Sequence, residues 1–336
     1  MSVIGDHHPR SLQRGQVCAG GGQRGRRGHA HGAVVVTGRE QLLDAAIPFL
    51  ESGIRAGDLV VLACGEETAA PLRSALGTRD ALLSEPRIAL RGARAPDAFG
   101  LTRRLLDRAA ASGSGRLRIL GIPEFGPEPI SWREGQRYES AANTILRDAP
   151  LSALCVYDAD VLPAPVVASA CVTHPYLLAH SDLADNPEYR PPRRYLAELP
   201  VPREPVEEGA PVFVVDAVAT LADLRHQLGA VLAQWVSDRD RREDLHLAVS
   251  EIAANAFRHG TPPVSARIWA EPGRIVCTIS DQGTAPVDPV AGFQPAHGED
   301  LSRGGMGLWL ARKLWDHVDL LHGPDGFTVR LSSPLN

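Results

Sequence analysis

The sequence predicts two domains of different fold class, a three-layer α/β domain followed by an α+β two-layer sandwich. The chain has 336 residues, which exceeds one typical domain and is long enough for two cores. Short apolar runs alternate with helical stretches in the first part, and the order of elements changes after the Pro- and Glu-rich segment LPVPREPVEEGAP. We therefore predict a disordered tail over residues 1–30, a first domain over 31–197, a linker over 198–211 and a second domain over 212–336.

Five apolar runs and the helices between them define the first domain. Strands are expected at AVVVTG, DLVVLACG, RIALRGA, RLRILGIP and LSALCVYDAD, with helices that include REQLLDAAIPFLESGIRAG, DAFGLTRRLLDRAAAS and WREGQRYESAANTILRDA. Such alternation favours a mostly parallel sheet with helices on both faces. The first strand is followed by neither G-x-x-x-x-G-K-[ST] nor G-x-G-x-x-G, so we expect no phosphate cradle at the usual place.

Composition excludes several classes of protein. A net charge of −5 gives no electrostatic footprint for nucleic acid or for an acidic membrane. No apolar run approaches the roughly 20 residues that span a bilayer, and the first 30 residues lack the apolar core of a secretory signal. The cysteines form no C-x-x-C pair, and we interpret Cys64, Cys155 and Cys277 as small hydrophobic residues in strands. This pattern fits a reducing compartment, so we expect a cytoplasmic protein.

The N-terminal histidines have two interpretations. The stretches HHPR and HAH offer imidazole ligands for a metal ion. Both fall in or beside a segment rich in Gly and Arg, and we interpret them as parts of the tail.

The second domain begins with the strand VFVV, two long helices and two strands, and continues with an irregular stretch, a helix and a final hairpin. In its second long helix, Leu245, Val249, Ile252 and Ala256 form one buried stripe, and Gly260 ends the helix.

A polar pair, Glu251 and Asn255, lies one helical turn apart beside that stripe. A carboxylate and a carboxamide offer hard oxygen ligands that suit Mg²⁺. The alternative is a solvated i,i+4 pair worth only tenths of a kcal/mol. The segment ESAAN, from Glu139 to Asn143, has the same spacing in the first domain without phosphate-binding signals behind it. The pair therefore needs support from the sequence that follows it.

That support consists of two further segments. The strand RIVCTIS leads into Asp281, where a carboxylate can accept a hydrogen bond from an exocyclic amine and Gly283 lets a flat ring approach the backbone. The irregular stretch TAPVDPVAGFQPAHGEDLSRGG is long enough for a lid, and it runs into GGMGLWLARKLWD, a glycine-rich helix start. Free backbone N–H groups at such a start bind phosphate.

In the first domain, the segments GIPEFG, RYESAANTIL, LCVYDADVLP and VTHPYLL resemble the MEDS sensory domain, a RecA-like α/β module without its phosphate loop, over about residues 29–182. The resemblance implies sensing, with a small-molecule ligand as one option. Cys155, Tyr157, Asp158 and His174 fall near strand ends, where parallel sheets place their ligand crevice. The alternative, which we favour, is that Asp158 caps a turn and His174 packs before Pro175.

The three segments of the second domain together resemble the ATP-binding boxes of the GHKL (Bergerat) ATPases over about residues 212–333, and SEIAANAFRHG is most similar to the anti-sigma-factor serine kinases. The resemblance implies ATP with Mg²⁺ as cofactor. It implies a role for each of seven residues, namely Glu251 as general base, Asn255 as Mg²⁺ ligand, Asp281 as adenine reader, Gly283 beside the ring, Gly305 and Gly307 at the phosphates, and Thr328 as a hydroxyl near the adenine. Ala285 departs from the family, many members of which have a second glycine there.

These features predict an ATP-dependent Ser/Thr kinase with a sensory domain. The predicted elements include no helical hairpin with an acceptor histidine, which disfavours a histidine kinase. They include no transducer domain either, which disfavours topoisomerases and repair ATPases. We expect an anti-anti-sigma (STAS) protein as substrate, with a sigma factor as a further partner and a homodimer left open. The alternatives are a module that binds ATP and a partner without phosphate transfer, and, more remotely, a metabolic enzyme built on the first domain.

Overall fold

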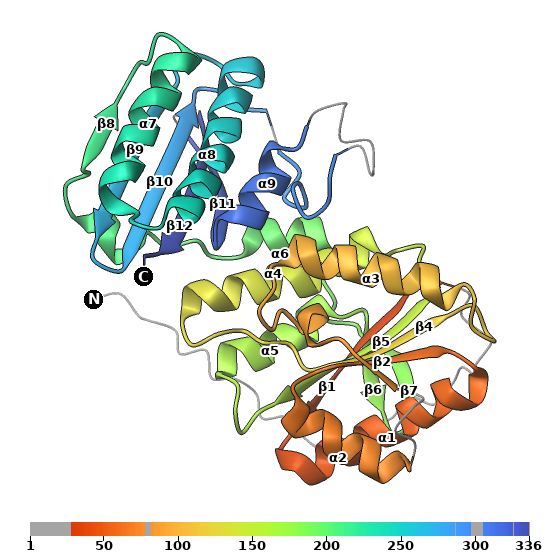
Figure 1. The fold of residues 1–336 in the computed structure, drawn as a ribbon. Helices are drawn as coiled ribbons and strands as arrows, with labels where there is room; N and C mark the ends of the chain where they lie inside the picture. The colour runs from red at the N-terminus through yellow and green to blue at the C-terminus, as the bar shows by residue number, and fades with distance from the viewer. Residues whose placement is uncertain (1–27, 78–81, 286, 297–304, 325, 336) are drawn as a thin grey trace, which may run out of the picture.

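Two sheets, each with its own helices, make up the structure, which is a computed structural model (Figure 1). It describes residues 28–77, 82–285, 287–296, 305–324 and 326–335. Most of the predicted tail and part of the predicted lid lie outside these residues. No helix among them combines the length and the apolar character that a membrane crossing requires.

The first sheet has seven strands in the order β3-β2-β4-β5-β1-β6-β7. The strands are β1 (Ala30–Val36), β2 (Leu59–Ala63), β3 (Leu82–Ser84), β4 (Leu117–Gly121), β5 (Leu151–Asp158), β6 (Tyr176–Ala179) and β7 (Asp182–Asp185). All neighbours are parallel except β6 and β7, which form an antiparallel hairpin. The prediction of a mostly parallel sheet is confirmed.

Helices cover both faces of this sheet (Figure 1). On one face lie α1 (Gly38–Ala56) and α2 (Glu66–Leu76), and on the other lie α3 (Ala95–Ala109), α4 (Pro129–Ile145) and α5 (Ala164–Thr173). The short helix α6 (Pro192–Glu198) packs against α4. Because both faces are covered, the strands β2, β4 and β5 are buried almost throughout, as their continuous apolar sequences predict.

One local prediction in this domain is wrong, and one local feature was not predicted. The run RIALRGA is not a strand, because Pro86 begins the 3-10 turn η1 (Pro86–Ala89) and Leu90 follows with a left-handed φ of 63°. The strand at this position is β3, which ends two residues before Pro86. The hairpin of β6 and β7 was not predicted either, since its short strands are only partly buried and lack a strong apolar alternation.

The second sheet is antiparallel and has the order β11-β12-β10-β9-β8. After the turn η2 (Pro205–Glu208), the elements are β8 (Phe213–Val215), α7 (Leu221–Trp235), α8 (Arg239–His259), β9 (Ser265–Glu271), β10 (Arg274–Asp281), α9 (Gly307–Leu314), β11 (His317–Gly323) and β12 (Gly326–Pro334). The order matches the prediction. Thr220 and Asp238 cap α7 and α8 by accepting backbone N–H bonds from Asp223 and Arg241.

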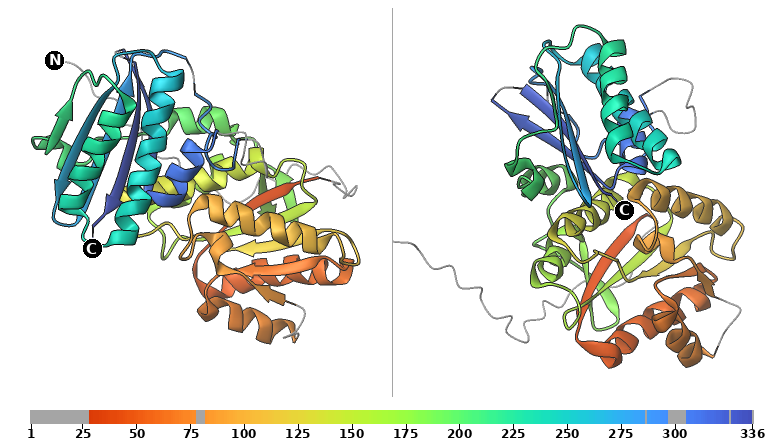
Figure 2. Two further views of the ribbon diagram at one scale, coloured as in Figure 1. Left: turned by 45° about the horizontal axis from the view of Figure 1, so that its top comes forward. Right: turned by 60° about the vertical axis from the view of Figure 1, so that its left-hand side comes forward.

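The helices α7, α8 and α9 lie on one face of the second sheet (Figure 2). From the first domain, α3 contacts α9 on this side, and α4 contacts β11 of the sheet. There the Arg137 Nη2 atom donates to the Asp319 Oδ1 atom at 2.6 Å, and the buried Arg330 donates to the other carboxylate oxygen. The two domains therefore share a buried, charged interface.

Apolar side chains of the predicted lid also reach the first domain. Val290 and Phe293 belong to the core between the first sheet and α3 and α4, and Phe293 is only 1% exposed. The Phe293 ring lies edge-on to Phe99 at 6.2 Å between centroids. This part of the lid is therefore packed into the first domain.

Candidate functional site

The helix α8 presents two sides, as the sequence predicts. Leu245, Val249, Ile252 and Ala256 are all buried in the core of the second domain. Packing of this stripe fixes the rotation of the helix, so Glu251 and Asn255 lie on its partly exposed side.

A cavity of about 330 Å³ lies between α8, β10, β12 and the start of α9. Its wall is largely apolar and includes Ile252, Ile279, Leu308, Phe327 and Val329. The polar lining residues are Asn255, His259 and Asp281, and the glycines are Gly260, Gly283 and Gly305. A cavity of this size, apolar with a few convergent polar groups, is typical of a small-molecule site.

Asp281 is the most constrained polar residue of the cavity. It ends β10 and is buried, and its Oδ1 atom accepts hydrogen bonds from the Thr261 N–H at 3.0 Å and the Gly283 N–H at 2.7 Å. Among the described residues nothing donates to its Oδ2 atom. A Cβ atom at Gly260 would lie 2.7 Å from that oxygen, and one at Gly283 would lie 2.6 Å from Oδ1. The two glycines therefore leave room beside a carboxylate that has one oxygen free to accept.

Asn255 lies where the start of α9 meets α8. A Cβ atom at Gly307 would lie 2.4 Å from the Asn255 Nδ2 atom, so glycine lets the two helices approach without displacing the Asn255 side chain. Gly305 has a left-handed φ of 74°, which favours glycine for the turn into α9. The first N–H groups of α9 therefore lie close to Asn255 at one end of the cavity.

Glu251 lies one turn before Asn255 and does not line the cavity itself. Its Oε1 atom is 3.5 Å from the Nη2 atom of Arg225, which α7 supplies. The sequence analysis missed Arg225, because nothing in the pattern of α7 marks it and only the packing of α7 on α8 brings it to Glu251.

The structure does not place Thr328 in the cavity. Side chains alternate along β12, so Phe327 and Val329 line the cavity while Thr328 lies on the opposite face of the sheet, where its Oγ1 atom is 2.7 Å from the Ser280 Oγ atom. The assignment of Thr328 as the hydroxyl near the adenine is therefore corrected, and Phe327 occupies the adjoining position on the cavity side.

Of the four candidate ligand-binding residues of the first domain, two have structural roles and two belong to a polar cluster. Asp158 caps the turns after β5 and β1, since its Oδ1 atom accepts from the Asp160 and Gly38 N–H groups, and this confirms the structural interpretation. Tyr157 is fully buried and packs against His174. Cys155 and His174, however, belong to a buried polar cluster.

Two interpretations made for residues of this cluster are wrong. His31, assigned with HAH to the tail, lies in β1 and is only 3% exposed. Cys155 is not simply a small hydrophobic residue, because its sulfur contacts His31 and Glu139. The sheet order explains both corrections, since it places β1 beside β5.

The fold and the cavity of the second domain define an ATPase domain of the histidine kinase-like class. Residues 214–333 match the family described as the histidine kinase-like ATPase domain, and residues 30–175 match the MEDS family, the methanogen/methylotroph, DcmR sensory domain.

Curated relatives identify the group within that class. The serine-protein kinase RsbW of Bacillus licheniformis is 31% identical over 125 residues, which cover 34% of this chain and 77% of that protein. The serine-protein kinase RsbW of Bacillus subtilis is 31% identical over 124 residues, again 34% of this chain and 77% of that protein. Through its C-terminal domain, the chain belongs to the family of RsbW serine-protein kinases, and it carries a MEDS domain in front of that domain.

Proposed function

We propose that the protein is an ATP-dependent serine/threonine protein kinase that acts in a partner switch. The observation that carries this proposal is the cavity in which Asp281 offers one free carboxylate oxygen while Asn255 lies beside the start of α9. The free oxygen suits the exocyclic amine of adenine, and the helix start suits the phosphates. The match to serine-protein kinases supports transfer to a hydroxyl group.

The residues beside the cavity fit a magnesium ion carried with the nucleotide. Asn255 and Glu251 place an amide and a carboxylate on the same side of α8, and oxygen ligands are those that Mg²⁺ prefers. Asn255 would hold the ion, which supplies charge neutralisation on the triphosphate. Gly305 and Gly307 let the backbone N–H groups of α9 approach the phosphates, and Gly283 lets the ring lie against the backbone.

Glu251 is the proposed general base. A phosphoryl transfer needs positioning and charge neutralisation together with a group that accepts the proton of the attacking hydroxyl. Glu251 lies one turn from Asn255 and is about one-third exposed, so an incoming protein substrate can reach its carboxylate. Arg225 would hold this carboxylate in place.

The proposed substrate is an anti-anti-sigma (STAS) protein, with a sigma factor as the alternative partner of the same kinase domain. We further propose that the first domain has a RecA-like fold and a sensory role. The protein would act in the cytoplasm, as a monomer or as a homodimer. We also propose that the tail ends at residue 30, the first domain at residue 197 and the linker at residue 211.

Contacts between the domains support a sensory input. Phe293 of the lid is buried in the first domain, and Arg94 at the start of α3 donates to the Lys313 carbonyl of α9 at 2.9 Å and to Asp316 at 2.7 Å. Both segments that adjoin the cavity, the lid and α9, are thus held by the domain proposed to sense. A rearrangement there would reach the nucleotide through these contacts.

The experiment that tests the kinase compares Glu251→Ala with the parent, using labelled ATP and candidate STAS proteins. The variant should bind ATP and partner like the parent and lose phosphate transfer by roughly a hundred-fold or more, as expected for loss of a general base. Equal transfer rates would contradict the base assignment. Tight binding of ATP and partner without transfer by the parent itself would favour the alternative, an ATP-binding module that sequesters its partner.

A further inference from the structure

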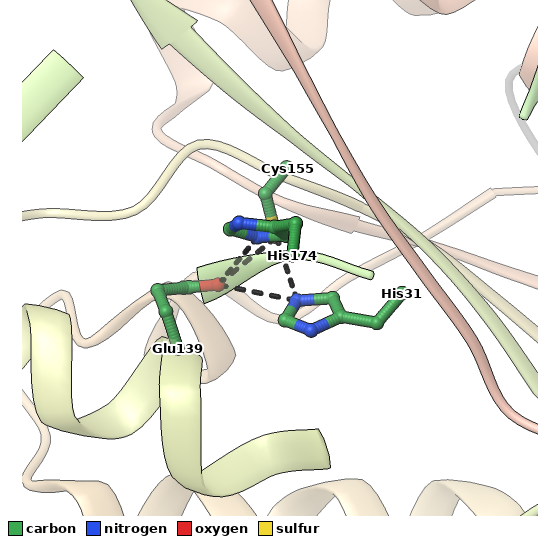
Figure 3. A group of neighbouring side chains, drawn as sticks. All are labelled: His31, Glu139, Cys155 and His174. Carbon is green, nitrogen blue, oxygen red and sulfur yellow. Dashed lines mark hydrogen bonds and ion pairs between the residues drawn. The ribbon is translucent and has the colours of Figure 1, made fainter. Parts of the chain in front are cut away.

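Four side chains meet inside the first domain, between the sheet and its helices (Figure 3). His31 comes from β1, Cys155 from β5, Glu139 from α4, and His174 follows α5. All four are buried, and their ligand atoms lie within 4.8 Å of one another. We propose that these four residues bind a zinc ion, at a site independent of the proposed kinase activity.

Four of the six distances between the ligand atoms are close to those of a tetrahedral metal site, and the other two are within 4.8 Å. The Glu139 Oε2 atom lies 3.1 Å from the His174 Nε2 atom, 3.2 Å from the His31 Nε2 atom and 3.3 Å from the Cys155 sulfur, and the sulfur lies 3.4 Å from the His31 Nε2 atom. Ligands at tetrahedral Zn²⁺ distances of about 2.0–2.3 Å are about 3.3–3.6 Å apart. The cluster therefore offers four donor atoms around one point, and it would accommodate the ion after side-chain shifts of about 1 Å or less.

The hydrogen bonds around the cluster fix the ring protons on the outer side. Asn143 donates through Nδ2 to the Thr173 carbonyl at 2.8 Å, which turns its Oδ1 atom toward the His31 Nδ1 atom at 3.1 Å. Because that oxygen can only accept, His31 must donate from Nδ1. The His174 Nδ1 atom likewise faces the Ala170 carbonyl at 3.1 Å. Both neutral rings then present the lone pair of Nε2 to the centre, the arrangement found in metal-ligating histidines.

Without a cation, the charges in this centre are not balanced. The buried Glu139 carboxylate lies 3.2 Å from the His31 Nε2 atom and 3.1 Å from the His174 Nε2 atom. A buried carboxylate facing two lone pairs is costly, and a divalent cation removes that cost.

The donor set selects the metal. Two imidazoles, one thiolate and one carboxylate suit a borderline-soft ion in a four-coordinate site, which favours zinc over Mg²⁺ or Ca²⁺. A cavity of about 40 Å³ borders His31, Glu139 and Cys155, with room for about one water molecule. His29 also lines it, and its buried Nε2 atom has no hydrogen-bond partner among the described residues. A small ligand could thus approach the ion from this side.

The test measures metal on the full-length protein. After loading with Zn²⁺ and dialysis, elemental analysis should find about one equivalent per chain, and Co²⁺ loading should give a thiolate-to-cobalt charge-transfer band. Cys155→Ser should abolish that band and lower the zinc content at least several-fold. The matched control Cys171→Ser, which changes a thiol outside the cluster, should keep both.

A zinc content well below one equivalent on the loaded parent would overturn the proposal, and so would bound Co²⁺ with no thiolate band. Equal zinc contents in Cys155→Ser and the parent would overturn it as well. Because a buried variant can misfold, the Co²⁺ spectrum of the unmodified chain decides the question without any variant. Nucleotide binding by the same preparations reports separately on the kinase domain.

Discussion

At the scale of single residues, Asp281 shows how the chain keeps one oxygen of a carboxylate available. Two backbone N–H groups occupy Oδ1, and Gly260 and Gly283 leave the space around it unfilled. The local backbone therefore orients the side chain before any ligand binds, which reduces the cost of ordering it on binding.

Replacing Asp281 by asparagine tests this assignment. Asn keeps an oxygen that can accept from Thr261 and Gly283, so the fold should persist, while the free acceptor oxygen becomes an amide donor. We expect calorimetry to show ATP affinity at least ten-fold weaker, about 1.4 kcal/mol, and no preference for adenine over guanine nucleotides. The matched control is Thr328→Val, on the opposite face of the sheet, which should bind ATP like the parent. Equal affinity for Asp281→Asn and the parent would refute the role of Asp281.

At the scale of elements, α9 is held between the two domains. It packs against α8 on one side and α3 on the other, and Lys313 pairs with Asp97 of α3 at 2.9 Å. Its first residue, Gly307, contacts α8 so closely that an added Cβ atom would lie 2.4 Å from the Asn255 Nδ2 atom and displace it. The position of the helix start therefore depends on a glycine and on both neighbouring helices.

Gly307→Ala should displace this helix start. The added methyl group would meet the Asn255 amide at 2.4 Å, and relieving such overpacking typically costs about 1–3 kcal/mol. We expect at least five-fold weaker ATP binding, with a melting temperature only a few degrees lower. Gly100→Ala is the control, because its methyl group in α3 finds its nearest neighbour, Arg104, only 3.9 Å away. An unchanged affinity in Gly307→Ala would show that the start of α9 does not contact the nucleotide.

The helix α4 links the proposed zinc site to the interface between the domains. Glu139 belongs to the buried cluster, while Arg137, two residues earlier, bonds to Asp319 and to the Val318 carbonyl of β11. One rigid element thus carries a residue of each site. A change in coordination at Glu139 would act on the same helix that holds β11.

At the scale of the whole molecule, the lid is shared between the domains through Phe293. Phe293→Ala should loosen it, since burial of such a ring is worth about 3–5 kcal/mol in a core. We expect ATP to dissociate at least five-fold faster in stopped-flow measurements, a change within the usual range of coupling between sites. Phe293→Leu should restore most of the parent rate. If both variants release ATP like the parent, the packing of the lid has no part in nucleotide binding.

The charged interface predicts a dependence of stability on pH. Burial raises the pKa of Asp319, but Arg137, Arg330 and Arg133 lower it by more, and it ends well below its usual range. A lowered pKa in the folded state stabilises the protein above the unfolded value of about 3.9, and this contribution is lost as the pH falls below that value.

Asp319→Asn should therefore melt several degrees lower than the parent at pH 7, and the difference should shrink below about pH 4. Scanning calorimetry across that range would measure both effects. Asp216→Asn, which removes an exposed partner of Arg267, is the control and should change little. A difference that stays constant down to about pH 2 would contradict the assigned role of the Asp319 charge.

The sequence by itself determined the order of the helices and strands in the second domain, the buried stripe of α8 and the parallel sheet of the first domain. These features depend on local periodicity and on glycines and prolines close in sequence, and such signals persist without tertiary context. Local sequence patterns also identified four candidate site residues that the structure places around one cavity, namely Asn255, Asp281, Gly283 and Gly305.

Tertiary structure alone decided the features that combine distant segments. The alternation of side chains along β12 places Thr328 on the face away from the cavity, and the strand order of the first sheet places His31 beside Cys155. The Glu139–Asn143 pair was set aside for lack of phosphate-binding signals behind it, yet Glu139 lies in the proposed zinc site and Asn143 orients His31. Spacing in a helix places side chains on one side of it, but only the packing of that helix determines which atoms they meet.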